Sequence, residues 1–437
     1  MQIQTVKTVR GGKRFAVTNG TDRNSSENLP IISVHPEITF QTIQGFGGAF
    51  TEAAACTLDQ LSAENREKVL ELYFDAQKGI GYTLGRIPMG SCDFSLGNYS
   101  YVADNDRTLS TFSIERDKEH VIPMVRDAMR YAKNLRLMAT PWSPPAYMKT
   151  NGDMNHGGRL KKEYAEQWAA CFEKFIMAYR AMGIHIQAVT VQNEPNADPR
   201  WDSCMYSAEE ERDFIIRYLG ERMKKLNVSI YFWDHNKDEM LQRAGSVMPL
   251  AEQYVCGMAF HWYTGDHFEQ LEMVHSLYPR LQLAFTEGCY EYSHGKRNTT
   301  QIGEGYAHDM IGNFNHFCNS FCDWNLLLDE RGGPNHVGNY CDAPIMADTK
   351  NDRILINDSY FYIGHFSRFI RPGAKRIGLS RWSDELEASA FRNPDRETVI
   401  VVLNRNDTDR EFSFRMEDRF IHCISEGHSI ATYLIRD

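Results

Sequence analysis

The sequence has no apolar run long enough to cross a bilayer and no cluster of lysine and arginine residues. Its formal net charge is −10, because 58 acidic side chains outnumber 48 basic ones over 437 residues. An acidic chain without basic patches is a poor partner for nucleic acid or for an anionic membrane surface. We therefore expect a neutral substrate, no nucleic-acid partner and no transmembrane segment.

The beginning of the sequence also lacks the apolar core of a secretory signal peptide, since residues 1–30 are polar throughout. The chain as written is therefore expected to stay in the cytoplasm. A specialised secretion route is the alternative that would carry it out of the cell.

The ten cysteines form no Cys-x-x-Cys motif, and several, such as Cys171 and Cys256, lie inside apolar helix or strand patterns. This distribution indicates free, buried thiols. Cys318 and Cys322 lie four residues apart with His316 close by, but the spacing of a zinc site is missing. We therefore expect neither a metal nor a cofactor.

Short strand-like segments separated by turn residues occur at both ends of the chain. The segments are residues 5–9, 31–34, 388–391, 399–403, 411–414 and 430–433. Each end is too short to enclose a core of its own. We therefore predict that residues 1–36 and 376–437 together form one side β-sandwich.

Between these ends, apolar strand-like runs alternate with helical patterns, which is typical of the α/β class with a parallel sheet and crossover helices. The predicted strands are residues 44–50, 82–88, 135–140, 186–192, 230–233, 257–262, 281–286 and 321–327. Eight such units favour a closed (β/α)8 TIM barrel over residues 41–372. An open doubly wound sheet would instead gather its ligands at one switch point.

A glycine-rich stretch, Gly45-Phe46-Gly47-Gly48, invites interpretation as a phosphate-binding loop. It lacks both the Gly-Lys-Ser/Thr ending of a P-loop and the full Gly-x-Gly-x-x-Gly spacing. We therefore interpret it as a tight exit from the first barrel strand.

A β-branched, apolar run in the middle of the chain ends abruptly in Asn193-Glu194-Pro195. The polar pair therefore lies where a buried strand emerges at the edge of a sheet. Because proline restricts the residue before it, we expect an extended backbone at Glu194, which would hold its carboxylate in one direction. For a lone glutamate, capping of the next helix or pairing with an arginine are the simpler alternatives.

A second stretch, Thr286-Glu287-Gly288, follows another apolar strand in the same way. Strand C-termini meet at one end of a barrel, so the two glutamates are expected to share one cleft. Paired carboxylates are the apparatus of glycoside hydrolysis, in which one protonates the leaving oxygen and the other attacks or activates water.

Further polar and aromatic side chains lie at or after the predicted strand ends. They are Arg86, Asp93, Trp142, His261, Tyr263, Trp324 and Asn325. Tryptophan faces stack on sugar rings, and Asp, Asn and Arg make the directional hydrogen bonds that distinguish hydroxyl groups. Taken singly, Trp142 and Trp324 could be core residues, and Arg86 with Asp93 could be a structural ion pair.

Several of these segments together resemble glycoside hydrolase family 30, the glucosylceramidase family. They run in order over nearly the whole predicted barrel: residues 44–52 (QGFGGAFTE), 85–95 (GRIPMGSCDFS), 141–145 (PWSPP), 192–195 (QNEP), 260–263 (FHWY), 286–288 (TEG) and 323–326 (DWNL). The resemblance implies a barrel with a side β-sandwich made from both termini. Animal members are secreted lysosomal proteins, from which this chain departs in lacking a signal peptide.

The resemblance also implies a retaining mechanism, with Glu194 as acid/base and Glu287 as nucleophile. The residues it places against the sugar are Asp93, Trp142, Asn193, Trp324 and Asn339, the last within residues 333–340 (GPNHVGNY). Arg86, His261 or Tyr263 would supply the hydrogen bond or positive charge that keeps the nucleophile ionised.

Three functions follow as expectations. The favoured one is hydrolysis of terminal β-glucosyl linkages in a small β-glucoside, an oligosaccharide or a glycolipid such as glucosylceramide. The same apparatus acting on β-xylosides or β-1,6-glucans is the nearest rival. A non-catalytic sugar-binding barrel is the third, and the presence of both glutamates argues against it.

Overall fold

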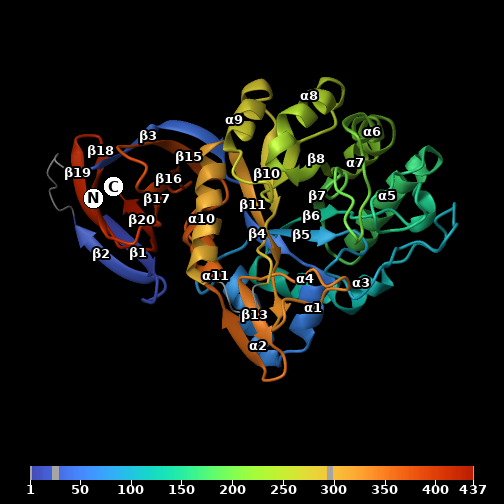
Figure 1. Ribbon diagram of the computed structural model, residues 1–437, viewed down its shortest axis with the longest axis horizontal. Coiled ribbons are helices and arrows are strands. Elements are labelled where there is room, and N and C mark those ends of the chain that lie inside the picture. Colours follow the sequence, from blue (N-terminus) through green and yellow to red (C-terminus); the bar gives the residue numbers. More distant parts are fainter. Residues whose placement is uncertain (1, 22–28, 293–298, 437) are drawn as a thin grey trace.

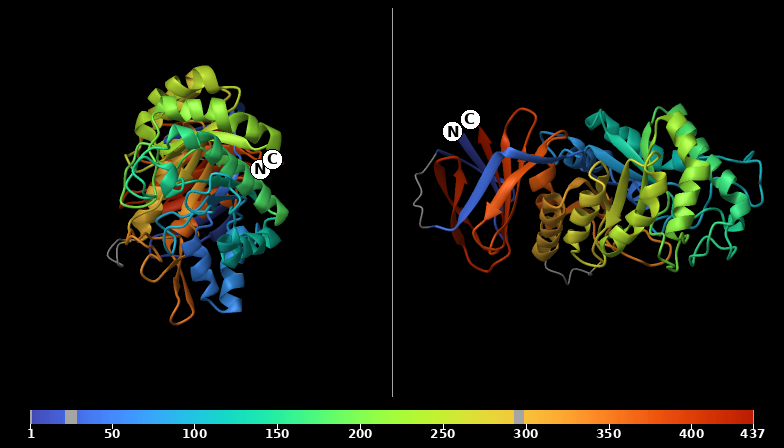
Figure 2. Two further views of the ribbon diagram at one scale, coloured as in Figure 1. Left: turned by 90° about the vertical axis from the view of Figure 1, so that its right-hand side faces the viewer. Right: turned by 90° about the horizontal axis from the view of Figure 1, so that it is seen from above.

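The computed structural model describes residues 2–21, 29–292 and 299–436. A barrel with its surrounding helices and a sheet-rich unit lie side by side along the long axis of the molecule (Figure 1). Both chain ends belong to the sheet-rich unit and lie next to each other, as Figure 2 shows from above.

Eight parallel strands close into a barrel in the order β10-β11-β4-β5-β6-β7-β8-β9. The strands are β4 (Gly45–Ala49), β5 (Leu84–Pro88), β6 (Arg136–Thr140), β7 (Ile186–Thr190), β8 (Ser229–Asn236), β9 (Gly257–His261), β10 (Gln282–Glu287) and β11 (Cys318–Asn325). Each strand predicted from the sequence overlaps one of these, and the prediction of a closed (β/α)8 barrel is confirmed.

Helices surround the barrel and cover its strands (Figure 1). They are α1 (Glu52–Asp59), α2 (Ala63–Phe74), α3 (Glu115–Glu119), α4 (Val121–Tyr131), α5 (Ala165–Ala181), α6 (Ala208–Phe214), α7 (Gly220–Leu226), α8 (Met240–Ala251), α9 (Phe268–Leu277), α10 (Thr299–Asn315) and α11 (Asp358–Ser367). On α5 the apolar residues at helical spacing, including Trp168, Phe172 and Phe175, are buried as packing residues. No helix in the described ranges is both long and apolar enough to span a membrane.

The glycine-rich stretch lies within β4 itself and does not form the exit from that strand. Gly47 pairs with Leu84 of β5, and a Cβ atom at Gly47 would lie 2.1 Å from the Leu84 carbonyl oxygen. The predicted tight exit was therefore wrong, because the glycines serve close approach of two strands.

The sheet-rich unit is one nine-stranded sheet in the order β19-β18-β3-β15-β16-β17-β20-β1-β2. Its strands are β1 (Gln2–Val9), β2 (Ala16–Thr21), β3 (Ile31–Thr42), β15 (Lys375–Arg381), β16 (Glu387–Arg392), β17 (Thr398–Asn404), β18 (Arg410–Met416), β19 (Arg419–Ser425) and β20 (Ser429–Arg436). The sheet curls over on itself, so that Phe414 of β18 packs against Tyr433 of β20 with ring centroids 4.8 Å apart.

This arrangement confirms that both termini build one sandwich, because β1 pairs along its whole length with β20. The β3 strand runs from Ile31 to Thr42 and so crosses the predicted limit at residue 36. Each terminal segment alone would leave an unpaired edge and an open apolar face.

A small third sheet extends the end of β11 and consists of β12 (Leu328–Asp329), β13 (Ile345–Asp348) and β14 (Arg353–Ile356). Residues 330–344 connect β12 to β13 and carry Asn335, Asn339 and Cys341. We call this connection the 330–344 loop.

Helix α11 joins the barrel to the sandwich through His365, which is fully buried. Its Nδ1 lies 2.8 Å from Thr432 Oγ1 of β20, and its Nε2 lies 2.9 Å from Thr8 Oγ1 of β1. Burial lowers the pKa of His365 to about 3, so the ring is neutral at neutral pH.

This neutral histidine should make the protein sensitive to acid. The unfolded chain returns the ring to its ordinary pKa of 6.5, so below that pH protons bind the unfolded state preferentially. Between pH 7 and pH 5 the free energy of unfolding should fall by about 2 kcal/mol more in the wild type than in His365→Gln. Chemical denaturation at both pH values measures this difference, and equal pH dependence of the two proteins would contradict it.

Candidate active site

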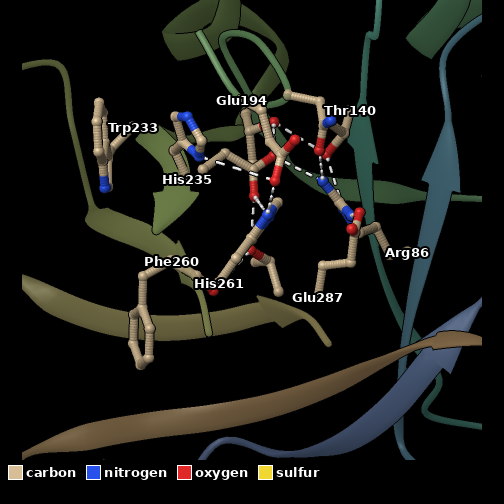
Figure 3. Close-up of polar contacts among 12 residues, drawn as sticks. Arg86, Thr140, Glu194, Trp233, His235, Phe260, His261 and Glu287 are labelled. Atoms are coloured by element: carbon tan, nitrogen blue, oxygen red, sulfur yellow. Dashed lines mark hydrogen bonds and ion pairs between the residues drawn. The ribbon is translucent and has the colours of Figure 1, made fainter. Parts of the chain in front are cut away.

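The carboxyl ends of the barrel strands bring charged side chains from distant parts of the chain into one cluster. Arg86 comes from β5, His261 from β9 and Glu287 from β10, and all three converge with Glu194 in Figure 3. Carboxylate oxygens of Glu194 and Glu287 and a ring nitrogen of His261 lie within 4.8 Å of one another. The two glutamates therefore share one cleft.

The backbone at Glu194 differs from the expected extended conformation, because its φ is +46°. The chain turns sharply after β7: Glu194 N donates to the Asp234 carbonyl at 2.9 Å, and the Glu194 carbonyl accepts from Ala197 N at 3.0 Å. The prediction from Pro195 was therefore wrong. A positive φ is unfavourable for a residue with a Cβ, and strain of this kind is typical of functional sites.

Arg86 is almost fully buried and binds the cluster together. Its Nη1 donates to Glu287 Oε2 at 2.6 Å, and its Nη2 donates to Asn193 Oδ1 at 2.8 Å and to Asp234 Oδ2 at 2.9 Å. These bonds use the planar fork of donors that only arginine offers. Arg86 thus orients the Asn193 amide and the carboxylates of Glu287 and Asp234.

Asp234 is the central acceptor of the site. Its carboxylate accepts from Arg86, from Thr190 Oγ1 at 2.7 Å and from Thr286 Oγ1 at 2.5 Å, and it contacts His261 Nε2 at 3.0 Å. Burial alone would raise the pKa of Asp234, but Arg86 and His261 hold it below its ordinary value. Asp234 is therefore a permanent negative charge beneath the reacting groups.

His261 bridges two carboxylates. Its Nε2 faces Asp234, and its Nδ1 lies 3.0 Å from Glu194 Oε1. Burial alone would lower its pKa, but the charge of Glu287 and the bonds to Asp234 and Glu194 raise the pKa of His261 to about 9. Both ring nitrogens are therefore donors at neutral pH.

The two glutamates have different environments. Burial raises the pKa of Glu287, and His261 and Arg86 oppose that shift. Burial would also raise the pKa of Glu194, but the hydrogen bond from His261 holds it below its usual range. A proton consequently lies on the His261 nitrogen that faces Glu194, within reach for acid chemistry at that carboxyl group.

Asp93 forms the far wall of the site. Asn335 Nδ2 and Asn339 Nδ2, both on the 330–344 loop, donate to Asp93 Oδ2 at 3.3 and 3.0 Å. In the described part of the chain no donor reaches the other carboxylate oxygen, and burial raises the pKa of Asp93 to about 7. A buried acceptor is thus available to ligand hydroxyl groups.

Trp142 and Trp324 stack on each other with ring centroids 5.2 Å apart. The Arg86 guanidinium lies 4.7 Å from the Trp142 ring centroid, and both tryptophans are buried. They also pack with Cys92 and Phe94, the two neighbours of Asp93 in the chain. Their rings are therefore part of the wall, and a stacking contact with a sugar face stays a prediction.

Tyr263 lies at the open side of the site and is 44 % exposed. Its hydroxyl donates to Glu287 Oε1 at 2.9 Å. Together with Arg86 it therefore places a donor on each oxygen of that carboxylate. Asn325 makes its hydrogen bond outside this group. Its Oδ1 accepts a hydrogen bond from Thr51, the residue that caps α1.

Asp234, Asn335 and Thr190 are among the site residues that the sequence analysis missed. Asp234 directly follows the predicted strand 230–233, so the rule that selected the other strand-end residues would have found it. Asn335 lies in the same segment as Asn339. Its part in the site is visible only from its contact with Asp93 in the structure.

Glu194, His261 and Glu287 also form the one group of potential metal ligands within the described ranges. Arg86 already places its positive charge 2.6 Å from Glu287, and both nitrogens of His261 contact carboxylates. A metal ion here would face two positive side chains, so this set does not fit one.

Comparison with known proteins identifies the family of the barrel and of the C-terminal part of the sandwich. The glycosyl hydrolase family 30 TIM-barrel domain matches residues 43–370, and the β-sandwich domain of that family matches residues 373–433. Mouse lysosomal acid glucosylceramidase is 34% identical over 98% of this chain and 88% of its own length.

Two solved structures share the complete architecture. SrfJ from Salmonella typhimurium is 40% identical, with a TM-score of 0.97 over 100% of both chains. An endo-β1,6-glucanase is 27% identical, with a TM-score of 0.90 over 99% of both chains. The chain therefore belongs to glycosyl hydrolase family 30 and is a glycoside-cleaving enzyme.

Proposed function

We propose that this enzyme is a retaining β-glucosidase that removes terminal β-glucosyl residues by double displacement. The observation that supports it is the pair of carboxylates, Glu194 and Glu287, with oxygens within 4.8 Å of each other. Retaining glycosidases hold their carboxyl groups about 5 Å apart, whereas inverting enzymes need about 6.5 Å or more to admit a water molecule.

Glu287 acts as the nucleophile in this proposal. Arg86 and Tyr263 donate to its two oxygens at 2.6 and 2.9 Å, which favours the ionised form and aims the carboxylate. One oxygen attacks the anomeric carbon as the bond to the aglycone oxygen breaks. The product of this step is a glycosyl ester of Glu287.

Glu194 acts as the acid and then as the base. The proton carried by the His261–Glu194 hydrogen bond passes through Glu194 to the leaving oxygen. In the second step Glu194 takes a proton from water, which attacks the anomeric carbon and releases Glu287, and this proton restores the hydrogen bond between His261 and Glu194. Asp234 holds His261 in place throughout, because it accepts from the other ring nitrogen.

Asp93 determines the preference for glucose. Its free oxygen lies in a buried wall, where a carboxylate makes strong bonds to hydroxyl groups distant from the reacting carbon. A sugar that lacks one of these hydroxyl groups leaves a buried acceptor unpaired.

The aglycone has two candidates. Glucosylceramide is supported by the similarity to mouse lysosomal acid glucosylceramidase over 98% of this chain. Hydrolysis of β-1,6-glucans is the second candidate, because the endo-β1,6-glucanase matches over 99% of both chains. Rates on short-chain glucosylceramide and on gentiobiose distinguish the two, and an aryl β-xyloside tests the xylosidase alternative.

The stereochemistry of the product tests the mechanism directly. Double displacement should release β-glucose first from an aryl β-glucoside, with α-glucose appearing only by mutarotation. Proton NMR during the first minutes of the reaction records the order of appearance. Initial release of α-glucose would show an inverting reaction and refute the proposal.

Substitution of the two glutamates tests their roles. Glu194→Gln should slow substrates with poor leaving groups by about 100- to 10,000-fold, while sparing glycosylation by dinitrophenyl glucoside, which needs no proton. Glu287→Gln should abolish turnover of both substrates. Glu304→Gln, a buried glutamate that contacts His428 outside the site, is the control. Equal losses on both substrates in both variants would mean that the division of roles is wrong.

Substitution of Asp93 tests the sugar preference. The wild type should favour aryl β-glucoside over aryl β-xyloside by about tenfold to a hundredfold in kcat/KM. Asp93→Ala should slow glucoside hydrolysis far more than xyloside hydrolysis, and so reduce the difference in kcat/KM between the two substrates. Asp93→Asn is the matched variant, because it keeps an acceptor oxygen in a side chain of the same shape. If Asp93→Ala slowed both substrates alike, the glucosidase assignment would give way to the xylosidase one.

A further inference from the structure

Two thiols lie together beside the catalytic cluster. Cys289 follows β10 two residues after Glu287, and Cys341 lies on the 330–344 loop two residues after Asn339. Their Sγ atoms are 3.3 Å apart. All ten cysteines are free and lie within the described ranges, where no other pair of thiols is in hydrogen-bond contact.

Backbone pairing holds these two segments in register. Glu291 and Cys341 form an antiparallel bridge, in which Asp342 N donates to the Tyr290 carbonyl at 2.8 Å and Tyr292 N donates to the Tyr340 carbonyl at 3.0 Å. Because side chains alternate between the faces of a strand, Cys289 lies on the same face as Glu291 and therefore on the face of Cys341. The backbone pairing of the two segments thus places the two thiols next to each other.

The thiol pair is connected to the proposed nucleophile through Tyr263. The Tyr263 oxygen lies 3.4 Å from Cys289 Sγ, and its hydrogen is donated to Glu287 Oε1 at 2.9 Å. The tyrosine hydrogen is donated to Glu287 and the Cys289 hydrogen to Cys341, so the tyrosine oxygen and the Cys289 sulfur are in contact without a hydrogen between them. The hydrogen bond to Cys341 and burial hold the pKa of Cys289 well above its usual range, so the hydrogen between the two sulfur atoms stays in place at neutral pH.

We propose that Cys289 and Cys341 form an oxidisable pair of thiols, and that their conversion to a disulfide by hydrogen peroxide slows the hydrolase. Hydrogen peroxide converts one thiol to a sulfenic acid and releases one water molecule. The second thiol then attacks the sulfenic sulfur, and the oxygen leaves as a second water molecule. Two electrons and two hydrogens pass from the thiols to the peroxide, and a dithiol reductant reverses the change.

Oxidation alters the contact with Tyr263 in a definite way. A disulfide bond is about 2.05 Å long, so the sulfur atoms must approach by about 1.3 Å from their separation of 3.3 Å. This approach shifts Cys289 Sγ relative to the Tyr263 oxygen, which now lies 3.4 Å away, and so disturbs the hydroxyl that donates to Glu287. The bond would further tie the β10 end to the loop that carries Asn339.

The experiment treats the full-length enzyme with hydrogen peroxide and follows two readouts. Mass spectrometry of proteolytic peptides identifies a Cys289–Cys341 disulfide, and kcat is measured on whichever aryl β-glycoside the enzyme turns over. We expect the disulfide to form together with a loss of about tenfold in kcat, as for one lost hydrogen bond at the nucleophile, and dithiothreitol should restore the activity.

Two variants make the test specific. Cys341→Ser keeps a hydrogen-bonding group beside Cys289, so it should retain basal activity but resist loss of activity by peroxide. Cys256→Ser removes a half-buried thiol that contacts Tyr231 and should respond to peroxide as the wild type does. If a variant folds poorly, peptide mapping of the oxidised wild type still tests the pairing.

Three results would overturn the proposal. These are the absence of the disulfide in oxidised enzyme, its formation without a change in kcat, and loss of activity in Cys341→Ser as fast as in the wild type. The predicted effect on rate rests on Glu287 being the nucleophile, which the Glu287→Gln variant tests separately. If the enzyme prefers a sugar other than glucose, the disulfide and the change in kcat can still be measured on the aryl β-glycoside that it hydrolyses.

Discussion

Arg86 carries its charge in the interior of the barrel, where it would be strongly destabilised without partners. It is stabilised there because Asp234 and Glu287 lie within 2.9 Å of its guanidinium and Asn193 accepts a further bond. Loss of one partner from such a buried pair costs about 3–5 kcal/mol, since it leaves a charge uncompensated. The positions of Glu287 and Asn193, and through Asp234 that of His261, therefore depend on this one cation.

The same balance of charge gives the site its chemistry. Two positive groups, Arg86 and His261, face three carboxyl groups, Asp234, Glu194 and Glu287. One carboxyl group is thus in surplus over the positive groups, and in the proposed mechanism a proton moves through the hydrogen bond between His261 and Glu194. A constellation of fixed charges and one mobile proton suits glycoside hydrolysis, which needs an ionised nucleophile beside an acid.

The fold supplies this arrangement by bringing distant strand ends together. Alternation of apolar runs with helical stripes was sufficient to predict eight barrel strands, because strands buried on both faces need continuous apolar residues. The rule that barrel chemistry lies at strand C-termini then selected Arg86, Glu287 and His261. Applied at the end of the predicted strand 230–233, it would also have found Asp234, which the structure places inside β8.

The sequence by itself determined the barrel, the pairing of its termini in one sandwich, and the position of both glutamates at strand ends. These features follow from local periodicity and from the need to bury apolar faces. Only the tertiary structure decided the positive φ of Glu194, the sharing of Asp234 between Arg86 and His261, and the contact of Cys289 with Cys341. The physical reason is that hydrogen bonds, pKa shifts and thiol contacts depend on distances in space between residues that lie far apart in the chain, and local pattern carries no record of those distances.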